Sequence, residues 1–171
     1  MHVLLAPLAL LLADPAAAQV PLEGHPVQTT TFTGERLGGP FGLGVALGAP
    51  TGVTGKIWLG DTMAVQFTAG ANLGQFKDVG ASVDWVLEFR PINVEGDEYA
   101  LPIHVGPGIK TDVSFQLPGG FLLMGPRVVA GVTLLVPTLP IDFHVEIAPT
   151  VYFMEQVGWD MEGQIGFRYY Y

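Results

Sequence analysis

Polar and apolar residues alternate through the last segment of the chain, Trp159 to Tyr171. As an extended strand, it would place on one face Trp159, Met161, Gly163, Ile165, Phe167, Tyr169 and Tyr171, and on the other Asp160, Glu162, Gln164, Gly166, Arg168 and Tyr170. The first face has no charged residue. Because successive side chains of a strand point to opposite sides, this segment suits a wall between lipid and a polar interior. It predicts the closing strand of a membrane β-barrel.

Seven earlier segments alternate in a similar way, over roughly the nine to eleven residues of a barrel strand. They are Phe41–Ala49, Val53–Leu59, Met63–Leu73, Val79–Arg90, Leu101–Ile109, Leu123–Val136 and Ile141–Thr150. With the closing strand, they predict an all-β chain that forms an eight-stranded antiparallel up-and-down transmembrane β-barrel. Side chains fill a barrel of this size, so we expect no open pore.

The same alternation predicts a charged lumen. The residues assigned to the interior are Lys56, Asp84, Glu88, Arg90, His104, Lys110, Arg127, Asp142, His144, Glu146, Asp160, Glu162 and Arg168. Burying so many ionisable groups is costly unless they pair and hydrogen-bond. We therefore expect an interlocked lumenal network with few free charges.

A soluble β-barrel or sandwich is the main alternative, in which the apolar face points inward and the charges face water. The aromatic residues favour the membrane barrel, because Trp and Tyr gather at membrane interfaces. The expected membrane girdle and assembly signal comprise Trp85, Phe89, Trp159, Ile165, Phe167, Tyr169 and Tyr171.

Composition excludes several classes of function. Charged residues make up 13% of the 171-residue chain, and the formal net charge is -9. Nucleic acid is an unsuitable partner, because phosphate contacts need clustered Lys and Arg, and only seven are spread along the chain. Cysteine is absent, which excludes disulfides, thiolate catalysis and Cys-based metal sites.

The first residues predict export. Val3 to Leu12 form an apolar stretch, and Ala16 to Ala18 supply the small residues of a cleavage site, so residues 1–18 are interpreted as a signal peptide. Residues 19–40 are expected to form a flexible leader, and residues 41–171 the barrel. The longest later apolar run, Val128 to Val136, is too short for a membrane helix.

Three stretches resemble a family of small bacterial outer-membrane β-barrel proteins that is described by a domain of unknown function and is similar in shape to the OmpA transmembrane domain. They are Gly42 to Leu59 (GLGVALGAPTGVTGKIWL), Glu146 to Pro149 (EIAP) and Ile165 to Tyr171 (IGFRYYY). The resemblance implies an eight-stranded barrel in the outer membrane of a Gram-negative-type bacterium and supplies no catalytic motif. The terminal aromatic pattern also looks like the signal that the barrel-assembly machinery reads.

With both termini in the periplasm, the expected outer connections are Pro50–Thr51, Gly74–Asp78, Asp112–Gly120 and Phe153–Gly158, and the periplasmic ones Gly60–Asp61, Pro91–Glu98 and Pro137–Leu139. None of the outer connections is long. The periplasmic acidic cluster of Glu95, Asp97 and Glu98 is interpreted as a solvated turn.

Two sets of residues have the side chains that a catalytic or a metal site would need. Ser82, His144 and Glu146 could form a hydrolytic set, and His104, His144 and Glu146 could bind zinc. No motif fixes either geometry, so we interpret these residues as part of the lumenal network and expect no catalytic residues, metal or cofactor.

The sequence therefore predicts a non-enzymatic, monomeric outer-membrane barrel with a structural or envelope-anchoring role, whose partners are membrane lipids and the assembly machinery. The alternative is a surface protein that binds a host or environmental macromolecule through its outer loops. A lipid-modifying enzyme is the third hypothesis.

Overall fold

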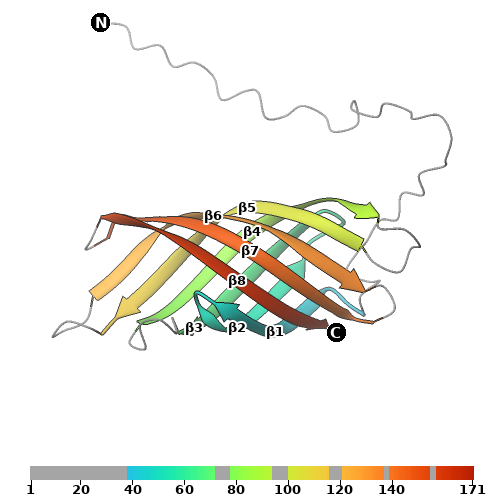
Figure 1. Cartoon of the computed structure of the whole chain (residues 1–171), viewed down its shortest axis with the longest axis horizontal. Coiled ribbons are helices and arrows are strands. Elements are labelled where there is room, and N and C mark those ends of the chain that lie inside the picture. The colour runs from blue at the N-terminus through green and yellow to red at the C-terminus, as the bar shows by residue number, and fades with distance from the viewer. Residues whose placement is uncertain (1–37, 72–77, 94–99, 116–120, 137–138, 155–156) are drawn as a thin grey trace, which may run out of the picture. The chain divides into compact units, whose positions relative to one another are not determined.

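The chain folds into one closed β-barrel, with its strands in the order β1-β2-β3-β4-β5-β6-β7-β8 (Figure 1). A computed structural model describes residues 38–71, 78–93, 100–115, 121–136, 139–154 and 157–171. The strands are β1 Phe41–Gly48, β2 Thr51–Trp58, β3 Met63–Ala71, β4 Asp78–Asn93, β5 Ala100–Ser114, β6 Phe121–Val136, β7 Ile141–Tyr152 and β8 Gly158–Tyr170. Every neighbouring pair is antiparallel, so the predicted eight-stranded antiparallel barrel is confirmed.

The predicted signal peptide, nearly all of the leader and the acidic cluster at Glu95, Asp97 and Glu98 lie outside the described residues. Within the described ranges, no helix is long and apolar enough to cross a membrane.

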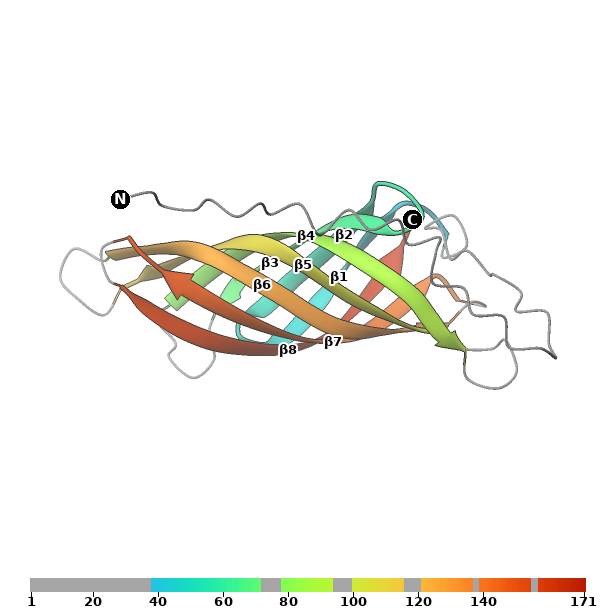
Figure 2. The same cartoon turned by 90° about the horizontal axis from the view of Figure 1, so that it is seen from above.

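The strand registers show that the strands are tilted relative to the barrel axis. A row of neighbouring residues that begins on β1 runs through Gly42, Lys56, Gln66, Asp84, Gly108, Arg127, Thr150 and Asp160. On β8, however, the neighbour of Gly42 is Tyr170 and not Asp160, so the row does not return to its start. Closure of a small barrel requires this stagger, and Figure 2 shows the resulting inclination of the strands.

The longest strands of the barrel are β4, β5 and β6. The prediction that Asp112–Gly120 forms a connection is wrong at its start, because β5 continues to Ser114 and pairs there with Phe121 of β6. Residues 91–93 likewise continue β4 instead of starting a turn, and the register with β5 shifts between Phe89 and Ile92. Pairing with a long partner strand thus extends these segments beyond what their own alternation indicates.

The two connections that lie wholly within the described residues are tight turns. Between β1 and β2, the Gly48 amide donates to Thr51 Oγ1 at 3.0 Å, and the Thr51 hydroxyl donates to the Gly48 carbonyl at 2.9 Å. Gly48 has φ of 137°, a conformation that strongly favours glycine. Between β2 and β3, the Leu59 amide donates to the Met63 carbonyl at 2.9 Å, around the predicted turn at Gly60–Asp61.

The two faces of the wall are opposite in character. Large apolar side chains are exposed on the outside, among them Val45, Leu47, Val83, Trp85, Ile109, Val128, Val145, Ile147 and Ile165. The buried interior holds polar and charged side chains together with a smaller apolar cluster that includes Trp58, Val86, Val129 and Leu135. The barrel therefore places its hydrophobic surface outward and its polar surface inward.

Candidate functional site

Asp142 and Arg168 form a buried ion pair in the lumen. They are direct neighbours on β7 and β8, and Arg168 Nε lies 3.2 and 3.1 Å from the two carboxylate oxygens of Asp142. The Tyr170 hydroxyl donates to Asp142 Oδ2 at 2.6 Å, and His144 Nδ1 lies 3.1 Å from Oδ1. Three partners therefore surround one fully buried carboxylate, as the burial of a charge requires.

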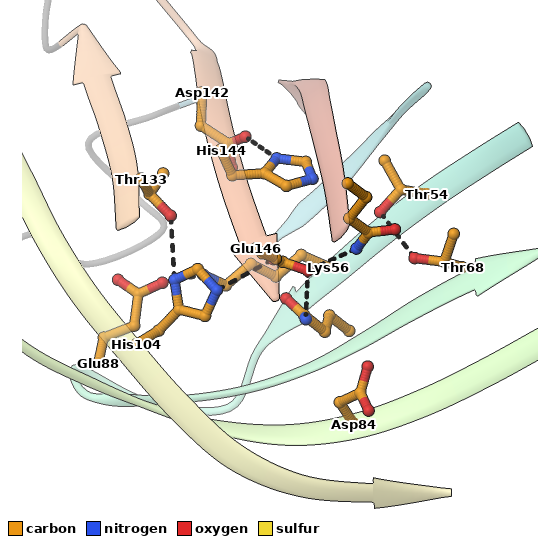
Figure 3. Close-up of polar contacts among 12 residues, drawn as sticks. Thr54, Lys56, Thr68, Asp84, Glu88, His104, Thr133, Asp142, His144 and Glu146 are labelled. Atoms are coloured by element: carbon orange, nitrogen blue, oxygen red, sulfur yellow. Dashed lines mark hydrogen bonds and ion pairs between the residues drawn. The ribbon is translucent and has the colours of Figure 1, made fainter. Parts of the chain in front are cut away.

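Glu146 is the second centre of this part of the lumen (Figure 3). His104 Nε2 lies 3.0 Å from Glu146 Oε1, and the Gln66 amide donates to Oε2 at 3.2 Å. The Gln164 amide also donates to Oε2. On the other side of the His104 ring, Nδ1 lies 3.3 Å from the Thr133 hydroxyl. Residues from β3, β5 and β8 thereby converge on one β7 carboxylate, and Thr133 of β6 holds the His104 ring from its other side.

Arg168 links the two carboxylates. Its Nη2 lies 4.0 Å from Glu146 Oε1, and its Nη1 lies 3.5 Å from Gln66 Oε1.

Lys56 forms an ion pair with Glu88 across the lumen, and its ammonium lies 4.2 Å from the centre of the Trp58 ring. A cation held against both a carboxylate and an aromatic face is stabilised by each.

A second cluster surrounds Arg127. Its Nε lies 2.9 Å from Asp84 Oδ1, and its Nη1 donates to Glu162 Oε2 at 3.1 Å. Lys110 pairs with Glu162 and also with Asp112, at 3.1 Å. The Tyr152 hydroxyl donates to Asp112 Oδ2 at 2.6 Å. Each cation here contacts two carboxylates, so removing one side chain leaves other pairs in place.

Glycines on the inner face make room for these side chains. A Cβ atom on Gly166 would lie 2.2 Å from the His144 ring, and one on Gly131 would lie 2.7 Å from His104 Nε2. A Cβ atom on Gly108 would likewise clash with the Asp84 carboxylate, and one on Gly80 with the Asp112 carboxylate. A small residue opposite a large one lets a narrow barrel hold long polar side chains without overpacking.

The structure brings most of the predicted lumenal residues together. Those buried in the interior are Lys56, Asp84, Glu88, His104, Lys110, Arg127, Asp142, His144, Glu146, Glu162 and Arg168. Asp160 is on the inner face, where it pairs with the buried Thr150, but it is not buried in the network: its side chain is exposed near the start of β8 and accepts a hydrogen bond from the Met161 amide at 2.8 Å. Arg90 belongs to β4, but its side chain lies outside what is described.

Several participants were missed by the sequence analysis. Asp112 was assigned to a connection, although it shares the strand face of Lys110. Tyr152, Tyr170, Gln66, Gln164 and Thr133 are uncharged and were not considered as partners. Their inward positions on alternating segments could have assigned them to the lumen. Their hydrogen-bond partners could not be predicted, because these depend on contacts across the lumen.

The expected girdle residues lie outward. Trp85, Phe89, Trp159, Ile165, Tyr169 and Tyr171 are exposed, and Phe167 is half-buried against Phe143, with ring centres 5.3 Å apart. Tyr171 packs on Tyr169, with ring centres 5.0 Å apart, and its amide donates to the Phe41 carbonyl at 2.9 Å. The end of the chain is therefore held by the first strand.

The structure assembles neither the hydrolytic set nor the zinc site that the sequence allowed. Ser82 Oγ is buried and has no hydrogen-bond partner among the described residues, while His144 contacts Asp142 and Glu146 contacts His104. No group of three or more His, Cys, Asp or Glu in the described ranges could hold a metal ion. The arrangement is that of a paired ionic network.

Comparison with protein-family models, with curated proteins and with solved structures gives no match for this chain.

Proposed function

We propose that this chain is an integral β-barrel of the bacterial outer membrane, with a structural or envelope-anchoring role and a lumen closed by its own side chains. One observation carries the proposal: the exposed outer face is apolar on all eight strands, whereas the paired charges are buried inside. This distribution reverses that of a water-soluble barrel. It is the one expected for a wall in contact with lipid.

Energetics favour lipid as the surrounding medium. Burying an apolar side chain such as Ile147 or Val145 gains about 1.5–3 kcal/mol relative to exposing it to water. A membrane covers all such side chains around the barrel at once. Because β1 pairs with β8, the sheet has no free edge, and the backbone hydrogen bonds close on themselves as a spanning structure requires.

The lumen supports a structural role in preference to transport. Among the buried described residues, four Lys or Arg side chains face six Asp or Glu side chains on six strands, and the hydrogen bond from Gln66 of β3 to Glu146 adds a seventh strand to the network. Side chains that lock strands together across the interior stabilise the wall and obstruct a path through it.

Assembly and partners follow from the same proposal. Membrane lipids contact the outer face, and the terminal aromatic residues Phe167, Tyr169 and Tyr171 are recognised by the barrel-assembly machinery. A closed barrel offers no edge for strand addition, which favours a monomer.

Heat-modifiability tests the proposal. The chain without residues 1–18 is refolded in detergent or lipid vesicles and run on a denaturing gel with and without boiling. We expect the unboiled protein to migrate faster, and boiling to abolish the difference. Equal migration, together with good solubility without detergent, would refute the membrane barrel in favour of a soluble β-protein.

One observation favours the alternative of a surface-interaction protein. Apolar side chains are exposed around the β7–β8 connection, at Phe153, Met154, Val157 and Trp159. If this connection binds a macromolecule, bacteria displaying the chain will adhere to immobilised matrix proteins or glycans, and Phe153→Ser with Val157→Ser will abolish adhesion without changing the heat shift. Adhesion equal to that of cells lacking the chain would exclude this alternative for the ligands tested.

A further inference from the structure

The start of β8 extends beyond the part of the barrel that β1 closes. The last β1–β8 pair joins Gly48 to Gln164, and the Ala49 amide donates to the Gly163 carbonyl at 3.1 Å as the chain turns toward β2. The first residues of β8, Gly158–Glu162, are paired with β7 but have no neighbour on β1. We call this stretch the β8 overhang, and Figure 1 shows β8 beginning beyond the β1–β2 turn. The absence of a free edge therefore holds only where β1 lies against β8.

The overhang presents backbone groups on its free side. The Gly163 carbonyl points toward β1, where it accepts from Ala49. Because alternate residues of a strand direct their backbone groups to the same side, the amides and carbonyls of Trp159 and Met161 point that way too. No described strand pairs with them there, and the Met161 amide donates instead to the Asp160 side chain at 2.8 Å. A row of unpaired amides and carbonyls is a template for another strand.

The side chains of the overhang define the strand that fits beside it. Trp159 and Met161 are exposed on the outer face, and the Asp160 carboxylate is exposed on the inner face. Every Lys or Arg side chain that the structure describes is buried, so among the described residues the exposed charge at this edge is negative. Neighbouring strands are stabilised by apolar pairs and by pairs of opposite charge. The edge therefore favours apolar residues on one face of an added strand and cations on the other.

We propose that the β8 overhang binds, by strand addition, an extended segment of another polypeptide in which apolar residues alternate with Lys or Arg. The added strand runs antiparallel to β8, along the line that β1 leaves at its turn. Its backbone pairs with Trp159 and Met161, and a cation lies beside Asp160. A second copy of the chain is less suitable, because two overhangs paired about Asp160 would set like charges opposite each other. The inference rests on the closed barrel and not on its membrane location.

A synthetic peptide tests the edge. The refolded chain in an uncharged detergent is mixed with a short fluorescent peptide of alternating valine and lysine, and binding is followed by fluorescence anisotropy. Amide hydrogen exchange of the barrel is then measured with and without the peptide. We expect binding, with exchange at the Trp159 and Met161 amides slowed about ten-fold. A peptide of alternating valine and glutamate, and a valine–lysine peptide with methylated backbone nitrogens, should not bind.

Two variants separate the backbone from the side chain. Met161→Pro removes the amide on the free side, and proline is tolerated where a strand's amide does not face its partner. We expect it to weaken peptide binding about ten-fold, because an edge hydrogen bond is lost. Met161→Ala is the matched control, which retains the amide and should bind nearly as well as wild type. Asp160→Asn should weaken binding and reduce its dependence on salt.

Several results would overturn the inference. They are no binding of the valine–lysine peptide, equal binding of the glutamate or methylated peptide, or binding that leaves exchange at Trp159 and Met161 unchanged. A barrel that is already dimeric, with these amides protected before the peptide is added, would assign the overhang to a second copy instead.

The heat shift of each sample separates this inference from the proposed function. A wild-type sample without a heat shift would contradict the closed barrel on which both depend. A normal heat shift without peptide binding would refute strand addition alone. If Met161→Pro lacks the heat shift, the methylated peptide provides the same comparison on the wild-type barrel.

Discussion

Arg168 and Asp142 face each other across the β7–β8 seam as direct neighbours, with both side chains fully buried and Arg168 Nε within 3.2 Å of both carboxylate oxygens. Tyr170 and His144 contact the same carboxylate. This pair lies where two adjacent strands and the rest of the lumenal network meet, so its loss should affect the whole barrel.

Removing Arg168 should destabilise the barrel strongly. Arg168→Met leaves Asp142 buried without its main cation, which typically costs about 3–5 kcal/mol of the free energy of unfolding. Arg168→Met with Asp142→Asn should cost less than the sum of the two single changes, because neither charge is then left alone. Denaturant unfolding of the refolded barrel measures these values, with Asp61→Asn in an exposed turn as the control. Additive effects would show that the pair is not coupled.

A charge on the outer face should be costly only if that face contacts lipid. Ile147→Lys, near the middle of β7, is expected to lower the free energy of unfolding in vesicles by about 2–4 kcal/mol. Val157→Lys places the same charge in the β7–β8 connection, where a surface change is worth about 0.5 kcal/mol. Equal, small effects of the two changes would contradict a lipid-facing wall.

Gly166 should not tolerate a larger side chain. The Cβ atom of Gly166→Ala would meet the His144 ring at 2.2 Å, and such overpacking typically costs about 1–3 kcal/mol. Gly60→Ala is the matched control, because nothing lies within 4 Å of a Cβ there. Adding His144→Ala should recover part of the loss by freeing the space. Unfolding of the four proteins in one detergent tests this, and identical stability of Gly166→Ala and wild type would contradict the packing.

The lumen should stay closed when one cation is removed. Arg127→Ala leaves Lys110 paired with Glu162 and leaves the Arg168 cluster intact, so we expect no conductance above the lipid baseline. Planar-bilayer recordings of wild type and variant measure it, and the heat shift of the same preparation establishes that folded protein is present. Discrete conductance steps in the wild type would contradict the closed lumen, and steps in the variant alone would assign the block to Arg127.

Deleting Tyr171 should separate assembly in cells from folding in detergent. The deletion removes the hydrogen bond to Phe41 and the aromatic contact with Tyr169, a small loss of about 1 kcal/mol for one hydrogen bond. Refolding yield in detergent should change little, whereas the amount of folded barrel in cells should fall if the assembly machinery reads this residue. Tyr171→Phe retains the ring and should restore assembly. Normal levels of the deleted protein in cells would contradict the assembly signal.

The alternation of side chains determined the faces of the wall and the number of strands. Lys56, His104 and Arg168 could be assigned to one side and Trp85 and Ile165 to the other from sequence alone, because the period of two is a property of the backbone of each strand. Strand ends were less certain: Asp112 was assigned to a connection, since its membership of β5 depends on a partner strand.

Only the tertiary structure decided which charges meet. Lys56 pairs with Glu88 from β4, and Glu146 gathers His104 and Gln66, because barrel closure and strand stagger bring distant segments together across the lumen. Face is a local property that a strand's own residues specify, whereas register and cross-lumen pairing are fixed by the combined packing of all eight strands.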